Sequence, residues 1–225
     1  LRNEMNSWIF PLHFIDFETS MVALPFTAGR KPYEQTAFQF SCHTLHKDGR
    51  MEHFEWIDAN QGAFPNFEFV KQLKAVLDKD DGTIFRYAAH ENTVLRQIQT
   101  QMLEDNEPEY AEIIEWIDSI TEWKDGSSRI AGPRNMVDML QLVRDYYYHP
   151  DMGGSNSIKK VLPAVMTGET IKQKYSKPLE FGTHLKGRVL YELDARSGKP
   201  VNPYYLLPSQ YGDLDLSQDE LIFED

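Results

Sequence analysis

Two acidic residues lie two positions apart in an otherwise apolar segment near the N-terminus. Asp16 and Glu18 interrupt Leu12–Glu18 (LHFIDFE), whose composition is typical of a buried strand. Because strand side chains alternate between two faces, both carboxylates point to one side, and Ile15 and Phe17 point to the other. Neighbouring carboxylates repel each other, and a divalent cation between them removes that cost. The pair therefore predicts a metal site; a polar face on an exposed strand is the alternative interpretation.

A third acid follows a second apolar segment. Thr83–Tyr87 (TIFRY) indicates a short strand, and Glu91 falls at the start of the helix expected over Glu91–Leu103. The helix dipole stabilises an acid in the first turn, so Glu91 could either stabilise this helix start or join the metal site. His90 could position a substrate, although a histidine at a helix start is also commonly structural.

Two later segments could support such a site. Asp138 lies at the start of an amphipathic helix expected over Met136–Tyr148, where capping is its simplest role and support of the site is the alternative. Gly153–Lys160 (GGSNSIKK) is a glycine-rich loop that leads into a basic helix start. Backbone N–H groups there, together with Lys159, could bind phosphate, and a solvated helix cap is an equally good interpretation.

The remaining pattern gives the order of the elements that would position these residues. Strands are expected over Leu12–Glu18, Gln35–Leu45, Arg50–Ile57 and Thr83–Tyr87, and helices over Phe67–Leu77, Glu91–Leu103, Glu109–Ile120, Met136–Tyr148 and Ser157–Val165. The turn Lys47–Gly49 joins the second and third strands as a hairpin. Three antiparallel strands, a helix, a fourth strand and further helices indicate an α/β sheet with helices on its faces. After about Lys174 the pattern weakens.

The second expected strand has a polar and an apolar face of its own. Gln39, Ser41 and His43 alternate with Cys42 along it, so the three polar side chains share one face and Cys42 points to the other. The polar side chains could flank the acids of the first strand, although a polar sheet face needs no function. We expect Cys42 to lie in the core.

Composition limits the class of protein. The chain has 225 residues, which is enough for one domain with a full core, and a formal charge of −12, which opposes broad electrostatic binding of duplex DNA. Its single cysteine excludes an intrachain disulfide. No apolar stretch has the roughly 20 residues needed to span a bilayer. We therefore expect a cytoplasmic protein that does not bind membranes.

The segment Phe14–Thr19 (FIDFET) resembles the first motif of the DEDD superfamily of 3'→5' exonucleases. More closely, the chain is similar to an uncharacterised bacterial domain family within that superfamily. The similarity covers residues 12–165 and rests on FIDFET, QFSCH, the region around Glu91 and SIKKVLP. Tyr87 departs from the pattern, because an asparagine often stands there.

This resemblance implies a ribonuclease H-like fold, in which a mixed sheet of three antiparallel strands followed by parallel strands has helices on both faces. It implies two Mg²⁺ or Mn²⁺ ions and release of mononucleotides from the 3' end of single-stranded DNA or RNA. Asp16, Glu18 and Glu91 become the expected catalytic metal ligands. Thr19, His90 and Lys159 become expected substrate contacts, and Asp138 a supporting residue.

The family's final acid, which follows a His or Tyr on a late helix, has no convincing counterpart. Tyr147 with Asp151 and Tyr211 with Asp215 have the spacing, but Pro150 interrupts the first pair and Gly212 the second. With no Met at position 1, this predicts a single domain over residues 1–225 that is a fragment of a longer protein with other domains and with the last motif beyond Asp225. The alternatives are a degenerate nucleic-acid-binding module and another phosphoryl-transfer enzyme on the same fold.

Overall fold

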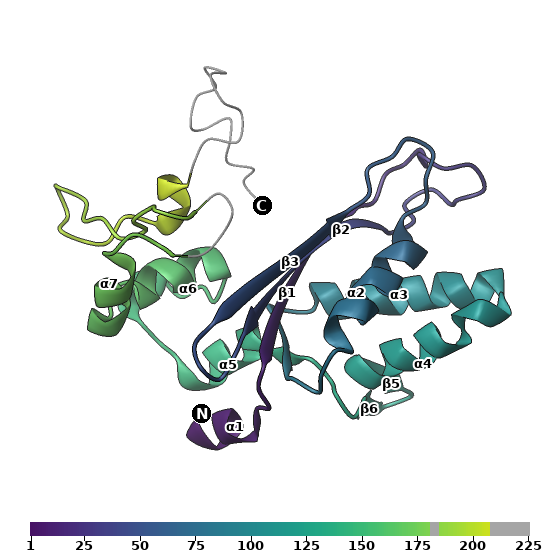
Figure 1. Cartoon of the computed structure of the whole chain (residues 1–225), viewed down its shortest axis with the longest axis horizontal. Helices are drawn as coiled ribbons and strands as arrows, with labels where there is room; N and C mark the ends of the chain where they lie inside the picture. The colour runs from purple at the N-terminus through teal and green to yellow at the C-terminus, as the bar shows by residue number, and fades with distance from the viewer. Residues whose placement is uncertain (181–184, 208–225) are drawn as a thin grey trace. The chain divides into compact units, whose positions relative to one another are not determined.

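The computed structural model describes residues 1–180 and 185–207, and contacts between residues divide the chain into two compact units (Figure 1). The first unit is Leu1–Tyr148, and the second begins at His149. Asp16, Glu18 and Glu91 all belong to the first unit, and each unit is described by itself. The division rests on contacts alone, so a single domain within a longer protein stays a prediction.

A five-stranded mixed sheet forms the centre of the first unit. Its strands are β1 (Leu12–Ser20), β2 (Thr36–Leu45), β3 (Met51–Ile57), β4 (Ile84–Arg86) and β7 (Val137–Asp138). They follow the order β3-β2-β1-β4-β7. The β1–β2 and β2–β3 pairs are antiparallel, whereas β4 pairs parallel to both β1 and β7. The predicted α/β class and the change from antiparallel to parallel pairing are confirmed.

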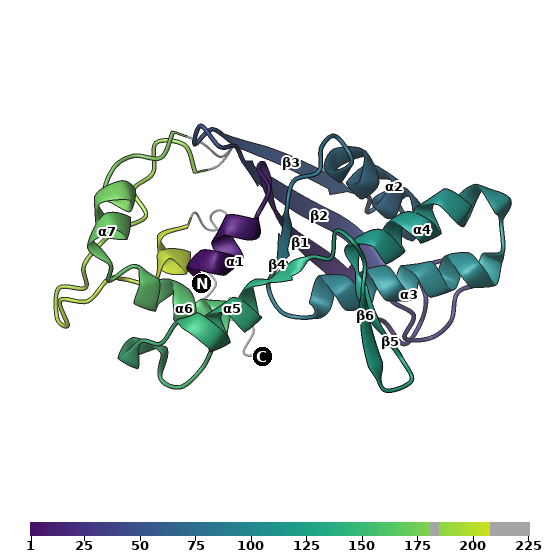
Figure 2. The ribbon, with the colours of Figure 1, turned by 90° about the horizontal axis from the view of Figure 1, so that it is seen from below.

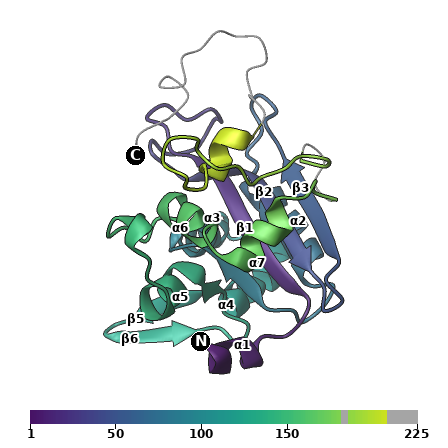
Figure 3. The same ribbon diagram turned by 90° about the vertical axis from the view of Figure 1, so that its left-hand side faces the viewer.

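Helices lie on both sides of this sheet. Figure 3 shows α5 (Met139–Tyr146) on the viewer's side of the sheet, with α2 (Asn66–Leu77), α3 (His90–Asp105) and α4 (Ala111–Ile120) behind the strands, and α1 (Arg2–Ser7) below them. The apolar positions at helical spacing in α2, α3 and α4 are the ones that the fold buries. With the inner face of the sheet they form one core, which includes Phe40, Phe69, Leu73, Leu95, Ile98 and Ile117.

The alternation of β1 separates core side chains from acids. Ile15 and Phe17 are 5% and 4% exposed, and the Phe17 ring packs edge-on against Phe69 with 4.9 Å between ring centroids. Burying one such apolar side chain stabilises the fold by about 1.5–3 kcal/mol. Asp16 and Glu18 are exposed on the opposite face, as the sequence predicted.

Strand β2 places polar side chains beside both acids. Asp16 pairs with Ser41 and Glu18 pairs with Gln39 across the antiparallel ladder. The register then shifts between Glu18 and Thr19, as at a β-bulge. Bulges change the direction of side chains and are frequent beside functional sites. Cys42 is fully buried, as expected.

The segment between α4 and α5 differs from the sequence-based expectation. A helix was expected from Met136, but Val137–Asp138 form β7 and the helix begins at Met139. The hairpin of β5 (Glu122–Asp125) and β6 (Ser128–Ala131) was not predicted, because its short strands are mostly exposed and carry no apolar alternation. Figure 2 shows this hairpin projecting from the body of the first unit.

Short helices make up the described part of the second unit. They are the 3₁₀ turn η2 (Pro150–Met152), α6 (Ile158–Val165), α7 (Glu169–Tyr175) and the 3₁₀ turn η3 (Pro203–Leu206). A further 3₁₀ turn, η1 (Pro108–Tyr110), precedes α4 in the first unit. Helix α6 was predicted, whereas α7 was not. Among the described helices of both units, none has the length and apolar character required to cross a membrane.

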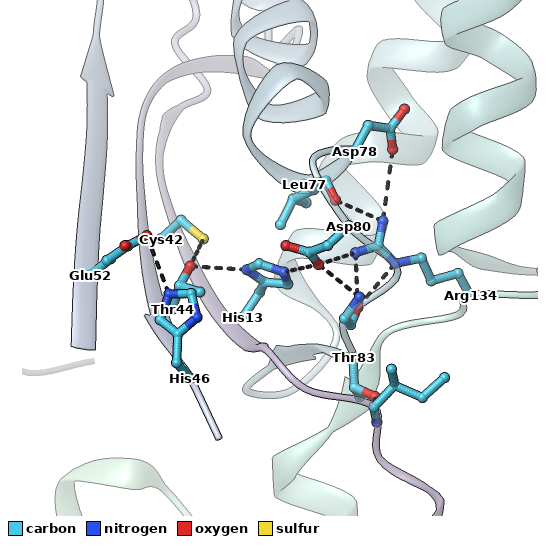
Figure 4. Close-up of polar contacts among 12 residues, drawn as sticks. His13, Cys42, Thr44, His46, Glu52, Leu77, Asp78, Asp80, Thr83 and Arg134 are labelled. Carbon is cyan, nitrogen blue, oxygen red and sulfur yellow. Dashed lines mark hydrogen bonds and ion pairs between the residues drawn. The ribbon is translucent and has the colours of Figure 1, made fainter. Parts of the chain in front are cut away.

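A buried histidine joins β1 to its neighbours on either side (Figure 4). His13 is 2% exposed, and its Nδ1 and Nε2 atoms lie 3.0 Å from Thr44 Oγ1 and 2.8 Å from Asp80 Oδ1. Asp80 Oδ1 also accepts a hydrogen bond from the Gly82 N–H, and Arg134 donates to the Gly82 carbonyl. The turn between α2 and β4 is thereby held against the start of β1.

Replacing His13 should destabilise the first unit. His13→Gln loses the ring that spans Thr44 and Asp80 and leaves buried polar atoms unpaired, which costs about 1–3 kcal/mol. Urea unfolding followed by circular dichroism measures the change. His53→Gln is the matched control, because this exposed residue of β3 should change stability by less than about 0.5 kcal/mol. Equal effects of the two substitutions would contradict this account of the network.

Candidate functional site

The candidate site lies where three parallel strands carry or precede acids. Asp16 is in β1, Glu91 follows β4 at the start of α3, and Asp138 ends β7. Strands β1, β4 and β7 run in one direction, with β4 in the middle. In open α/β sheets, ligands bind outside the carboxyl ends of parallel strands. The fold therefore brings residues from distant parts of the sequence to the usual position for a site.

Glu91 is buried, although a glutamate with the usual pKa is charged at neutral pH. The residue is 3% exposed, and within the described chain its Oε2 atom is buried without a hydrogen-bond partner. Burial raises the pKa of Glu91 to about 7, and the negative charges of Asp16 and Asp138 add to the effect. Its own backbone N–H and the Arg86 guanidinium oppose it. A cation beside this carboxyl would reverse the effect of burial.

Asp16 and Glu18 provide two exposed carboxylates on the same face of β1. Residues two apart in a strand are separated by about 6.6 Å, so both carboxylates can reach one ion between them. Asp16 is also close enough to Glu91 for its charge to raise the pKa of that group. An unpartnered buried oxygen and two exposed oxygen-rich side chains are suitable ligands for Mg²⁺ or Mn²⁺.

The carboxylates of Asp16, Glu18 and Glu91 are not gathered around one point in this structure. In residues 1–180 and 185–207, no group of three or more His, Cys, Asp or Glu side chains is gathered as metal ligands are. Asp16 and Glu18 project from an exposed strand face, where their side chains are free to adopt other rotamers. The three acids are therefore candidate ligands on neighbouring elements, and their metal-binding role stays a prediction.

The structure brings together two of the predicted substrate contacts. Thr19 Oγ1 and His90 Nε2 are 3.4 Å apart, which connects the end of β1 to the start of α3. Both side chains therefore lie beside the segments that carry Glu18 and Glu91. The third predicted contact, Lys159, belongs to α6 in the second unit, and its role stays a prediction.

Asp138 caps α5 and also contacts the segment before Glu91. Its carboxylate accepts hydrogen bonds from the Leu140 N–H at 2.9 Å and from the Ala88 N–H at 3.0 Å. The Arg86 Nη1 atom lies 3.2 Å from its other oxygen. The capping role that the sequence offered is therefore confirmed, and support of the candidate site stays a prediction.

Arg86 is the main residue of this region that sequence reasoning missed. It is 2% exposed on β4 and pairs with both Asp138 and Glu122. A single arginine within the apolar segment TIFRY was the available signal, because a buried cation requires acidic partners. Those partners are far apart in sequence and could not be identified from it.

Of the two candidate pairs for the fourth acid, Tyr147 with Asp151 lies among the described residues, and it is not part of an α-helix. Tyr147 follows the end of α5, and Asp151 lies in the 3₁₀ turn η2. A hydrogen bond from Lys199 lowers the pKa of Asp151, so this carboxylate already has a cationic partner. Tyr211 and Asp215 lie outside the described residues.

Comparison with known families identifies the family of this chain. Residues 13–157 match the model of the family described as "Domain of unknown function (DUF2779)". The chain belongs to this family. No curated protein and no solved structure matches the chain. The DUF2779 match contains Asp16, Glu18, Glu91 and Asp138, and it ends before Lys159.

Removing the charge of Glu91 should stabilise the metal-free protein at high pH. The pKa of Glu91 is raised from 4.5 to about 7, so between these values the folded state binds more protons than the unfolded state. Its contribution to stability is therefore complete below about pH 4.5 and is lost as the pH rises through 7. Relative to wild type, Glu91→Gln should gain up to about 3 kcal/mol between pH 4.5 and 8.

Urea unfolding in EDTA at several pH values measures this gain. The control is Glu115→Gln, an exposed acid on α4, whose effect should not change with pH. A pH-independent difference between Glu91→Gln and wild type would show that burial does not perturb this carboxyl.

Proposed function

We propose that this DUF2779 chain carries the core of a metal-dependent 3'→5' exonuclease that acts on single-stranded nucleic acid. The observation that carries the proposal is the placement of three acids on adjacent elements. Asp16 and Glu18 are exposed on one face of β1, and the buried Glu91, whose pKa the charge of Asp16 raises, follows the neighbouring strand β4. Acids that repel each other and lack enough partners favour a bound cation, which would draw these three carboxylates together.

The sheet supports assignment to the ribonuclease H-like fold. Its antiparallel β1, β2 and β3, followed by parallel β4 and β7, reproduce the order that the resemblance to DEDD exonucleases implies. In that arrangement the first strand carries the first two acids, and the third follows the fourth strand. Asp16, Glu18 and Glu91 have these places.

The chemistry follows from the candidate ligands. When bound, two Mg²⁺ or Mn²⁺ ions would lower the pKa of an attacking water and stabilise the leaving oxygen of an in-line displacement. Asp16 would hold both ions, and Glu18 and Glu91 would complete their ligands from β1 and α3. Thr19 and His90 would orient the end of the strand. A water-orienting His or Tyr would come from elsewhere in the protein.

A cavity in the first unit supports a single-stranded substrate. Loops that follow β1 and β3 enclose about 480 Å³, lined by residues that include Ser20, Phe26, Arg30, Phe38 and Phe64. The Arg30 guanidinium stacks 3.7 Å from the Phe64 ring centroid, and Phe26 is 74% exposed. Unpaired bases stack on aromatic and guanidinium surfaces, which base-paired bases do not reach. The charge of −12 also disfavours broad contact with a duplex.

A second candidate is a module that binds nucleic-acid ends without cutting them. Tyr87 stands where the exonuclease pattern often has asparagine, and within the described chain no group of three or more potential ligands is gathered. Such a module would retain the cavity and bind single strands in EDTA. It would not shorten them with Mn²⁺.

Substitution of Asp16 should weaken metal binding and slow cleavage together. Asp16→Asn removes the charge that both ions would share, so calorimetry should show at least a tenfold loss of Mn²⁺ affinity, and cleavage of a 5'-labelled single strand should fall about 10²-fold or more. Glu115→Gln on α4 should leave both unchanged. Wild-type affinity in Asp16→Asn would refute the metal site, whereas Mn²⁺ binding without any cleavage by the full-length protein would favour the binding module.

Truncation of Phe26 should weaken substrate binding more than turnover. Phe26→Ala removes an exposed ring of the cavity, and loss of one stacked base costs about 1–3 kcal/mol, which corresponds to a 5- to 150-fold higher KM. Because the ring is remote from the acids, kcat should change little. Phe54→Ala on β3 is the control, since that ring is also exposed but does not line the cavity. An unchanged KM for Phe26→Ala would exclude stacking there.

A further inference from the structure

A buried guanidinium lies behind the turn that leads to Glu91. Arg86 ends β4 and is 2% exposed, and both of its terminal nitrogens are bonded. Nη1 lies 3.2 Å from Asp138 Oδ2 and also donates to the Ala88 carbonyl, while Nη2 donates to Glu122 Oε1 at 2.9 Å. Arg86 therefore connects β4 to β7, to the hairpin strand β5 and to the turn after β4 that contains Ala88.

The turn adopts a conformation that its own residues do not favour. Ala88 has a φ of 71°, in the left-handed region where a side chain is disfavoured. Both of its peptide groups are held by the ion pair: its N–H donates to Asp138 Oδ1 at 3.0 Å, and its carbonyl accepts from Arg86. Helix α3 begins directly afterwards, and its N-cap residue Ala89 supplies no side-chain hydrogen bond. The start of α3 is thus positioned by Arg86 and Asp138.

Arg86 is also connected, through Glu122, to Asn92, the residue that follows Glu91 in α3. Glu122, its second acidic partner, is bonded through its backbone to Asn92: the Glu122 N–H donates to Asn92 Oδ1 at 2.9 Å, and the Glu122 carbonyl accepts from Asn92 Nδ2 at 3.0 Å. The network therefore holds α3 before Glu91, at Ala88, and after it, at Asn92.

We propose that Arg86 is a positioning residue for Glu91, and that its ion pairs with Asp138 and Glu122 fix the first turn of α3, which carries the Glu91 carboxylate. This inference rests on the proposed metal site. Stability alone gives a poor account of the network, because apolar side chains often replace buried ion pairs without loss of stability. The Nε atom of Arg86 is itself buried without a partner in the described chain. Residues behind a metal ligand commonly tune affinity 10- to 100-fold.

The test measures Mn²⁺ affinity by calorimetry in folded variants at low temperature. Arg86→Gln should weaken binding about 10- to 100-fold, as is usual for residues that orient metal ligands. Adding Ala88→Gly should restore most of this loss, because glycine adopts a positive φ without help. Arg86→Lys should be intermediate, since it keeps the charge but loses the planar fork.

Arg134→Gln is the matched control. Arg134 also clamps a turn, through the Leu77 and Gly82 carbonyls, but it contacts none of the three acids. Its loss should lower the melting temperature and leave Mn²⁺ affinity unchanged. If Arg86→Gln does not fold, Glu122→Gln replaces it and should weaken binding in the same direction. Wild-type affinity in folded Arg86→Gln, or no rescue by Ala88→Gly, overturns the proposal.

Hydrogen exchange separates this inference from the proposed function. Exchange at amides 89–93 should accelerate in metal-free Arg86→Gln, return towards wild type with Ala88→Gly, and stay unchanged in Arg134→Gln. If wild type binds no Mn²⁺, the proposed metal site fails, and this exchange pattern still decides whether Arg86 positions the first turn of α3. Unchanged exchange in Arg86→Gln would refute the positioning role.

Discussion

Burial of Ile15 and Phe17 against the helices behind the sheet determines the geometry of the candidate site. Because a strand has only two faces, packing these side chains inward forces Asp16 and Glu18 outward together. A slip of one residue in register would bury both acids and expose Ile15 and Phe17, at a cost of several kcal/mol, which is a large fraction of the stability of a typical domain. The core of the first unit thus fixes the direction of the acids without any contact to them.

Glu91 differs from Asp16 and Glu18, because its own carboxyl is buried. Its carboxyl is held inside the protein at a pKa of about 7, with one oxygen unpartnered in the described chain. A buried carboxyl of this kind is usually less stable than an apolar replacement, a loss that proteins tolerate mainly at functional sites. In the proposed role, the network of Arg86, Asp138 and Glu122 holds the helix start that carries it.

Local patterns in the sequence were enough to predict β1, β2, β3 and the three long helices, because each has a strong period and a clear apolar face. They also placed Asp16 and Glu18 on one face. The strands β5, β6 and β7 were missed, since β7 has two residues and the β5–β6 hairpin has no apolar alternation. The partners of Arg86 were missed for another reason: ion pairs between distant segments leave no periodic signal.

The ion pairs of Arg86 also constrain how this family can change over evolutionary time. The guanidinium is buried between acids from two other segments, so an apolar residue at position 86 alone removes a cationic partner from both Glu122 and Asp138. Substitutions at positions 86, 122 and 138 are therefore expected to be coupled. Glu122 also pairs with Arg129 and Asp138 also caps α5, so relatives with an apolar residue at position 86 can keep either acid in that second role, and a glycine at position 88 should accompany the exchange. Covariation among these four positions would record the constraint in the sequences themselves.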